Sequence, residues 1–269
     1  MTATVALSIA GSDPSGGAGI QADLKTFSAL GAYGASVLVA LTAQNTQGVT
    51  GVHVVPTGFV TQQLDTLAVD VRIDAVKIGM LATAAVADAV AAFLQRQRCD
   101  VVVLDPVMVA TSGDRLLADD AVEAVRRLLP LASVVTPNLA EAATLLDEPV
   151  ATTVDAMVAQ GHRLVAAGAP RVLLKGGHLT GDGTATDVLV GPDGVELLTG
   201  PRIDTVNTHG TGCTLSSALA ALRPQRPDWS RTARDAKTWL TGALAAADVL
   251  EVGRGHGPVH HFHDVWGRP

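Results

Sequence analysis

The chain carries the sequence NTHGTGCT at residues 207–214, directly before a run of small and apolar residues with helical character, Thr214–Ala220. The small residues and glycines leave the backbone N–H groups of this loop uncovered. The first N–H groups of a helix lack partners within the helix, and the helix dipole adds partial positive charge there. The stretch therefore predicts an anion site at a helix N-terminus, with the thiol of Cys213 in its field. The alternative is a glycine-rich connection that only lets a helix pack closely, as is common in α/β proteins.

A second glycine-rich stretch lies near the N-terminus, where the apolar run Thr4–Ala10 is followed by GSDPSGGAG at residues 11–19. The G-x-G-x-x-A spacing of a dinucleotide fold occurs at residues 17–22, but its first glycine lies too far beyond the strand. The acidic residue expected about 20 residues later is also missing. A P-loop would need a lysine where Gly17 stands. Both phosphate motifs fail, and the loop is expected to wrap a small ligand with its backbone.

Composition favours a compact cytoplasmic enzyme. The chain has 269 residues, 48% of them hydrophobic, a formal net charge of −7 and only two cysteines. Two cysteines do not suggest a disulfide scaffold, and the absence of a basic cluster argues against a nucleic-acid partner. The uncharged stretch Thr26–Leu64 is broken by glycines and polar residues, so neither a membrane span nor a signal peptide is predicted.

Strand-like and helix-like segments alternate along the chain. The strand-like runs are close to continuously apolar, which predicts a mainly parallel sheet with helices on both faces. The expected strands are Val5–Ile9, Ser36–Leu41, Ala75–Ile78, Val101–Leu104, Ser133–Thr136 and Arg171–Leu174, with a hairpin at Thr186–Val190 and Val195–Leu198. The expected helices are Ile20–Leu30, Phe59–Val69, Thr83–Arg96, Asp119–Leu129, Leu139–Leu146, Val154–Ala167, Gly212–Leu222 and Thr232–Leu250. Ligands of such sheets bind beyond the carboxyl ends of the strands.

The chain resembles the bacterial hydroxymethylpyrimidine/phosphomethylpyrimidine kinases of thiamine biosynthesis, which belong to the ribokinase-like superfamily. The resemblance extends over nearly the whole chain, in order. It is carried by residues 10–23, 42–46, 77–81, 105–108, 136–141, 175–178, 207–214 and 255–262. It implies a single ribokinase-like domain over residues 1–269, a three-layer α/β fold, use of ATP and Mg²⁺, and a homodimer.

The resemblance also implies a Mg-ATP region. Asp105, Asn138 and Glu141 would organise magnesium, and Lys175 would lie near the ATP phosphates. Thr208, Gly210 and Gly212 would complete the nucleotide site, with the two glycines also forming the anion hole for the transferred phosphoryl group. Alternatives remain from the residues alone: Asn138 as a helix N-cap, Glu141 as a first-turn acid, and Lys175 as a solvated turn residue.

For the acceptor, the resemblance implies a planar aminopyrimidine that carries a hydroxymethyl group. Gln44 is the expected specificity residue, since its amide offers donors and an acceptor to a ring nitrogen and an exocyclic amine. The same pocket would be lined by Asp23, Gly11, Ala18, Met80 and Val107. Gln44 could instead be a polar loop residue, and Met80 and Val107 ordinary core. His209 is expected to support its loop, and a zinc site among the tail histidines 256, 260, 261 and 263 is disfavoured because no cysteine or acidic cluster completes it.

Cys213 stands where most ribokinase-like sugar kinases carry an aspartate base. The change is understandable if one site performs two phosphorylations. The first acceptor is an alcohol, which gains from a base, whereas the second is a phosphate that a permanent carboxylate would repel.

The resemblance thus implies an ATP-dependent kinase that converts 4-amino-5-hydroxymethyl-2-methylpyrimidine to its monophosphate and then to its diphosphate. A pyridoxal kinase is the alternative enzyme, and a pyrimidine sensor is the non-catalytic alternative. The presence of Asp105, Lys175 and Cys213 argues against a sensor, because a protein that only binds the pyrimidine would not need them. A dehydrogenase is disfavoured by the glycine spacing.

Overall fold

The computed structural model describes residues 2–108, 119–177, 179 and 183–266. Its strands form one sheet in the order β3-β2-β1-β4-β5-β6-β7-β8-β9. Their bounds are Thr4–Gly11 (β1), Ala32–Asn45 (β2), Gly48–Val54 (β3), Ala75–Ile78 (β4), Val102–Leu104 (β5), Val134–Val135 (β6), Val172–Leu174 (β7), Thr184–Gly191 (β8) and Gly194–Pro201 (β9). Counted along the sheet, the six strands from β2 to β7 are parallel to one another. At one edge β3 pairs antiparallel with β2, and at the other edge β8 pairs antiparallel with β7 and β9 with β8.

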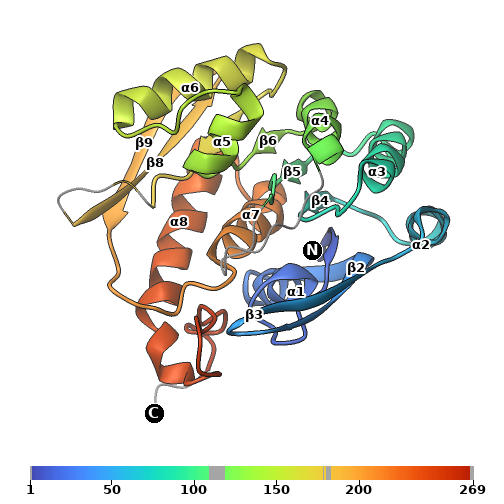
Figure 1. The fold of residues 1–269 in the computed structure, drawn as a ribbon, viewed down its shortest axis with the longest axis horizontal. Helices are drawn as coiled ribbons and strands as arrows, with labels where there is room; N and C mark the ends of the chain where they lie inside the picture. Colours follow the sequence, from blue (N-terminus) through green and yellow to red (C-terminus); the bar gives the residue numbers. More distant parts are fainter. Residues whose placement is uncertain (1, 109–118, 178, 180–182, 267–269) are drawn as a thin grey trace.

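Helices cover both faces of the sheet (Figure 1). The first face carries Thr57–Asp70 (α2), Ala84–Gln97 (α3), Asp119–Leu128 (α4), Leu139–Leu146 (α5) and Val154–Ala166 (α6). The second carries Gly19–Ala29 (α1), Thr211–Leu222 (α7) and Trp229–Ala245 (α8). Short 3₁₀ turns lie at Leu129–Leu131, Arg223–Gln225 and Ala247–Leu250. The predicted three-layer α/β fold is confirmed. Among the described residues, no helix combines the length and apolar character that a membrane span requires.

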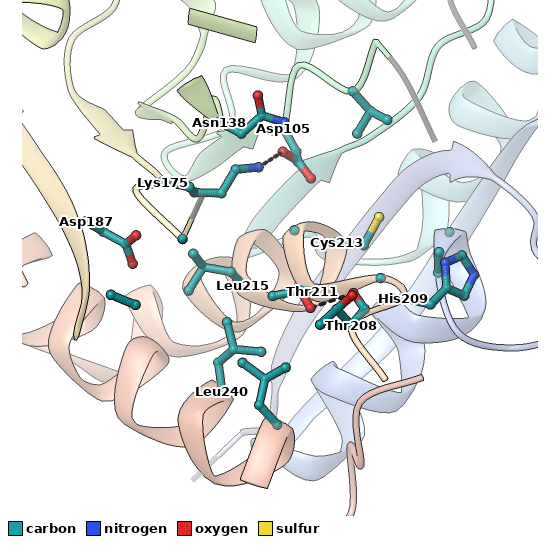
Figure 2. Close-up of a pocket in the computed structure, with 18 of the residues that line it drawn as sticks. Asp105, Asn138, Lys175, Asp187, Thr208, His209, Thr211, Cys213, Leu215 and Leu240 are labelled. Atoms are coloured by element: carbon teal, nitrogen blue, oxygen red, sulfur yellow. Dashed lines mark hydrogen bonds and ion pairs between the residues drawn. The ribbon is translucent and has the colours of Figure 1, made fainter. Parts of the chain in front are cut away.

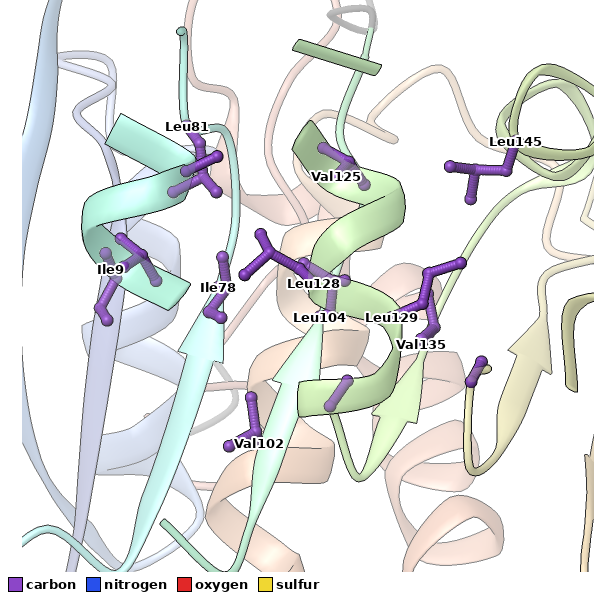
Figure 3. Packing of buried hydrophobic residues seen from close by; sticks show 14 of the residues in the cluster. Ile9, Ile78, Leu81, Val102, Leu104, Val125, Leu128, Leu129, Val135 and Leu145 are labelled. Carbon is purple, nitrogen blue, oxygen red and sulfur yellow. The ribbon is translucent and has the colours of Figure 1, made fainter. Parts of the chain in front are cut away.

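The core of the first face shows why the strands are so apolar. Ile9, Ile78 and Leu104 project from adjacent strands and pack beneath Leu128 at the end of α4 (Figure 3). All four side chains are at most 1% exposed. Burial of each such side chain stabilises the fold by about 1.5–3 kcal/mol. Central strands enclosed on both faces need no polar alternation, which explains the continuous apolar runs.

Two predicted elements differ from the structure. The expected strand Ser36–Leu41 is part of the longer β2, and the unpredicted strand β3 pairs with its second half. β3 is mostly exposed, so its sequence GVTGVHV shows no buried face to identify it. The last helix begins at Trp229 rather than at Thr232, because Asp228 caps it by accepting a hydrogen bond from the Arg231 N–H. It ends at Ala245, ahead of the 3₁₀ turn.

Candidate active site

The carboxyl ends of the parallel strands border a cavity of about 910 Å³. Residues that follow β1, β4, β5 and β7 meet there because these strands run in the same direction, and the N-terminus of α7 enters the same space. Of the residues expected from the sequence, the structure brings together along its wall Gly11, Ala18, Gln44, Met80, Asp105, Val107, Asn138, Glu141, Lys175, Thr208, Gly210, Gly212 and Cys213.

A compact charged cluster lies on one side of the cavity (Figure 2). Lys175 Nζ donates to Asp105 Oδ1 over 2.9 Å and lies 3.6 Å from Glu141 Oε2. Burial opposes ionisation of Asp105, but Lys175 and Lys77 outweigh burial and hold its pKa below the ordinary value. Burial likewise opposes the charge on Lys175, but Asp105 and Glu141 raise its pKa. The cluster therefore presents a permanent ammonium group at the cavity wall.

Glu141 differs from Asp105 in its ionisation. Burial raises the pKa of Glu141 to about 7, with Lys175 opposing this shift and the charge of Asp105 adding to it. Glu141 and Asn138 also form a reciprocal capping box. Asn138 Oδ1 accepts from the Glu141 N–H at 2.9 Å, and Glu141 Oε2 accepts from the Asn138 N–H at 2.7 Å. The N-cap alternative for Asn138 and the first-turn position of Glu141 are thus both realised, and both residues still line the cavity.

The N-terminus of α7 has the features of an anion site. Gly210 precedes the helix with φ +75°, and no side-chain cap covers the helix end within the described part of the chain. A Cβ atom on Gly210 would lie 1.8 Å from the carbonyl oxygen of Gly17, so a glycine is required where these two loops touch. Thr211 Oγ1 donates to Thr208 O over 2.7 Å, which closes the turn before the helix. Thr211 N–H donates to Thr208 O over 3.2 Å, and the next residues of the first turn, Gly212 and Cys213, face the same cavity as Lys175.

Cys213 lies in the first turn of α7 as a neutral thiol. Burial raises its pKa to about 11. Lys77 opposes this shift, Asp23 and Asp105 reinforce it, and the Gly19 N–H at the start of α1 donates to the sulfur. The first turns of two helices therefore meet at this sulfur, which carries a proton at neutral pH.

Asp23 does not line the cavity as the sequence analysis expected. Its side chain is fully buried and accepts two hydrogen bonds of 2.9 Å from Lys77 Nζ. Ser8 Oγ and Ser217 Oγ donate to the same carboxylate over 2.6 and 2.7 Å. Of the two residues in this ion pair, Lys77 is the one that lines the cavity. Lys77 belongs to the family-like stretch 77–81 but was not expected at the site, although a lysine within the apolar strand AVKI was a detectable signal.

Asp13 organises the first glycine-rich loop and was also missed. Its carboxylate accepts hydrogen bonds from the N–H groups of Ser15, Gly17 and Ala18 over 2.8–3.1 Å. His209 Nε2 lies 2.7 Å from Asp13 Oδ2, and 3.5 Å from Gln44 Nε2. The expected loop role of His209 is therefore seen, and this residue joins the two glycine-rich loops. An aspartate two residues before Ser15 was the available signal, because such a pair favours an Asx turn.

The far part of the cavity is apolar. Leu215 of α7 and Leu240 and Leu244 of α8 line it, and Figure 2 shows the first two near one another. At its margin, Lys237 Nζ donates to Asp187 Oδ2 over 2.6 Å, while Asp187 Oδ1 accepts from the Gly176 N–H. This pair joins α8, β8 and the loop after β7. No pattern in the sequence placed Asp187 beside Lys237.

The C-terminal segment packs against the anion-site loop. His209 N–H donates to Gly257 O over 3.0 Å, and His261 Nε2 lies 3.0 Å from Thr214 Oγ1. Burial lowers the pKa of His261 to about 3, so this imidazole is neutral. Across the residues that the structure describes, no three His, Cys, Asp or Glu side chains gather into a possible metal site. His178, which belongs to one of the family-like motifs, lies outside the described residues.

Comparison with known proteins agrees with this geometry. The family described as phosphomethylpyrimidine kinase matches residues 13–260. The hydroxymethylpyrimidine/phosphomethylpyrimidine kinase of Escherichia coli (strain K12) is 60% identical over 262 residues, covering 97% of this chain and 98% of its own. The phosphomethylpyrimidine kinase of Clostridium difficile 630 has a TM-score of 0.79 and 38% identity, covering 90% and 99%.

A related kinase of different name has a similar structure. The ADP complex of Bacillus subtilis pyridoxal kinase has a TM-score of 0.90 and 35% identity, over 99% of this chain and 100% of its own. The fold is therefore shared by kinases that differ in acceptor. At the level of sequence, the match to the pyrimidine kinases is closer and extends from the Asp13 loop to His260. This chain belongs to the phosphomethylpyrimidine kinase family.

Proposed function

We propose that the chain transfers the γ-phosphoryl group of ATP to the hydroxymethyl group of 4-amino-5-hydroxymethyl-2-methylpyrimidine, and then a second one to the resulting monophosphate. The product is the pyrimidine diphosphate used for thiamine synthesis. One observation carries the proposal: the Lys175–Asp105–Glu141 cluster, the open N-terminus of α7 and Gln44 all face a single cavity. Phosphoryl transfer depends on charge stabilisation and positioning, which these groups supply.

The ATP phosphates fit between Lys175 and the first turn of α7. An ammonium group and unpaired N–H groups both attract phosphate oxygens, and they stabilise the charge on the transferred group most when it passes between donor and acceptor. The apolar part of the cavity, bordered by Leu215, Leu240 and Leu244, suits the purine base. Thr208, Gly210 and Gly212 line the same cavity and would complete the nucleotide site.

The acceptor fits on the side of Cys213 that faces away from the ATP phosphates. Gln44 would pair with the ring nitrogen and amine, and Gly11, Ala18, Met80 and Val107 would enclose the ring. Met80 already packs on Gly11, whose added Cβ would lie 2.4 Å from the Met80 methyl carbon. Asp23 then acts from beneath the site by holding Lys77. Cys213 lies where the attacking oxygen would need to lose its proton.

The donor set fits Mg²⁺ held partly through water. Asp105, Glu141 and the amide oxygen of Asn138 are oxygen ligands, but Lys175 already contacts both carboxylates. Magnesium usually keeps several waters and takes few protein ligands, so contact through water and the ATP phosphates is compatible with this lysine. When bound, the ion would supply further neutralisation of phosphate charge. Lys175 contacts both carboxylates and so fixes their positions at the cavity wall.

An assay with parallel acceptors tests the proposal. ATP consumption would be coupled to a spectrophotometric readout with hydroxymethylpyrimidine, its monophosphate or pyridoxal as acceptor, and the products would be resolved by phosphorus NMR. Turnover of both pyrimidines to the diphosphate is expected, with Lys175→Gln as the inactive control. The similarity to pyridoxal kinase makes pyridoxal the second candidate acceptor. Turnover of pyridoxal alone would overturn the pyrimidine assignment, and binding without turnover would favour the sensor.

We also propose that residues 1–269 act as a single kinase domain that forms a cytoplasmic homodimer. The exposed apolar side chains of Leu41 on β2 and Phe59 on α2 support an association surface. Light scattering over a concentration series would measure the oligomeric state, and Phe59→Glu is expected to shift a dimer toward monomer.

A further inference from the structure

His209 lies between a buried carboxylate and the side chain expected to recognise the substrate. Its Nε2 atom lies 2.7 Å from Asp13 Oδ2 and 3.5 Å from Gln44 Nε2. His209 is 6% exposed and Asp13 is 1% exposed. The Gly257 carbonyl accepts from the His209 N–H, so the backbone of the histidine is fixed as well. A Cβ on Gly17 would lie 2.3 Å from the imidazole, which shows how closely the ring is enclosed.

Asp13 decides which nitrogen of His209 carries the proton. Burial opposes ionisation, but hydrogen bonds from His209, Ser15 and Ala18 outweigh it and lower the pKa of Asp13 to about 2. An ionised carboxylate only accepts hydrogen bonds. The nitrogen that faces it at 2.7 Å is therefore protonated, and Nε2–H is a donor.

This donor constrains the amide of Gln44. Thr42 Oγ1 donates to Ser12 O over 2.9 Å, so its single hydrogen is used and it offers Gln44 an acceptor at 3.1 Å. On the other side, His209 Nε2–H is donated to Asp13 over 2.7 Å and is only shared with Gln44 at 3.5 Å, but this protonated nitrogen has no lone pair with which to accept from the Gln44 amide. A half-turn of the amide, which exchanges two groups of nearly equal size, places Nε2 against Thr42 and Oε1 against His209. The Thr42 contact is then a donor–acceptor pair and the amide oxygen faces the protonated nitrogen of His209, whereas the opposite orientation sets donor against donor there.

We propose that His209, held by Asp13, is a positioning residue that locks the Gln44 amide with its oxygen toward His209 and its nitrogen toward Thr42. The remaining N–H and oxygen lone pair then face the cavity in a fixed order. They match a ring edge on which an amine and a ring nitrogen are neighbours. This extension rests on the proposed function. A pyridoxal ring has no amine beside its nitrogen, so the lock favours the aminopyrimidine over pyridoxal.

A double-variant cycle on the full chain tests the coupling. His209→Leu removes the donor, and is expected to raise the KM for hydroxymethylpyrimidine about 3-fold, less than one full hydrogen bond because the N–H is shared with Asp13, with little change in kcat. The ratio of kcat/KM for pyrimidine over pyridoxal should fall. His209→Gln, which restores an N–H donor, should recover most of the loss. In a Gln44→Ala background, His209→Leu should have no further effect. His256→Leu is the matched control in the neighbouring loop, and should leave both acceptors unchanged.

A full additional loss in the Gln44→Ala background would overturn the proposal, because His209 would then act through the fold alone. A second measurement needs no turnover. The Gln44 side-chain amide protons, identified by their loss in Gln44→Ala, are expected to show nuclear Overhauser effects to Thr42 and not to the His209 ring. The reverse pattern would refute the orientation. Failure of the wild-type chain to phosphorylate hydroxymethylpyrimidine would reject the proposed function, while the amide measurement still decides the orientation.

Discussion

Lys77 Nζ lies 2.9 Å from both carboxylate oxygens of Asp23, and neither side chain is exposed to solvent. The pair joins β4 to α1, and Ser217 of α7 also donates to Asp23. Charges buried this fully are tolerated when each has a partner and further hydrogen bonds. Asp23 therefore holds Lys77 at the cavity wall, and the pair fixes the electrostatic surroundings of Cys213.

Replacement of Lys77 should destabilise the fold strongly. Lys77→Met leaves the Asp23 charge buried without its partner, and a loss of about 3–5 kcal/mol in the free energy of unfolding is expected. Adding Asp23→Asn should recover part of this loss. Urea denaturation measures both variants. Arg96→Met breaks the half-exposed pair with Asp65 and should cost less than about 1 kcal/mol. A Lys77→Met loss as small as that of Arg96→Met would contradict this account.

Cys213→Ala is expected to impair the first phosphorylation much more than the second. The alcohol must lose a proton, and only the thiolate form of Cys213, a minority at neutral pH because the pKa is about 11, can accept it, whereas the phosphate acceptor is already ionised and gains nothing from a base. A reduction of at least about 10-fold in the first step, against less than about 3-fold in the second, is expected from the usual size of such assistance. Single-turnover assays with each acceptor measure the two steps. Cys99→Ala is the control, and equal losses in both steps would reject the hypothesis.

Cys213→Asp tests the reason for a thiol at this position. Because burial keeps the pKa of Cys213 near 11, the native site holds no negative charge there at neutral pH. A carboxylate would repel the phosphate acceptor, so the second step should fall further than the first. A variant that retains the second step at the native rate would show that charge at residue 213 does not limit it.

Glu141 should make stability fall as pH rises. Its pKa is about 7 in the folded chain, against an ordinary value of 4.5, so the folded state holds more protons than the unfolded state between these values. The stabilising proton is present below pH 4.5 and is lost toward pH 7. Glu141→Gln lacks this titration, and its stability relative to wild type should improve by on the order of 2 kcal/mol over that interval.

Denaturation without nucleotide at a series of pH values measures this difference. Glu148→Gln removes a carboxylate paired with Arg163 outside the cavity and serves as the control. A difference between wild type and Glu141→Gln that stays constant with pH would contradict the raised pKa.

Gly210→Ala and Gly31→Ala form a matched pair. Both glycines have φ near +75°, but a Cβ at Gly31 meets nothing within 4 Å, whereas at Gly210 it would collide with Gly17 O. Gly31→Ala should therefore cost only the backbone strain of about 1–2 kcal/mol and leave activity unchanged. Gly210→Ala should in addition abolish most phosphoryl transfer by separating the two loops. Equal activities of the two variants would argue against this loop contact.

Much of the fold was predictable because its signals are local. Central parallel strands are buried on both faces, so apolar runs such as Val101–Leu104 predict the strands, and the segments between these runs predict the helices. β3 escaped prediction because an exposed edge strand has no buried face, and only pairing with β2 defines it. The start of α8 depended on the cap at Asp228.

The sequence by itself determined the alternating architecture and the strand ends at which Asp105 and Lys175 stand, since hydrophobic periodicity and parallel connection follow from neighbouring residues. Only the tertiary structure decided which distant side chains meet. It paired Asp23 with Lys77, joined Asp13 to His209 across 196 positions, and placed Lys237 on Asp187. These contacts join separate segments, and the energy of each depends on burial and on a partner that no local pattern specifies.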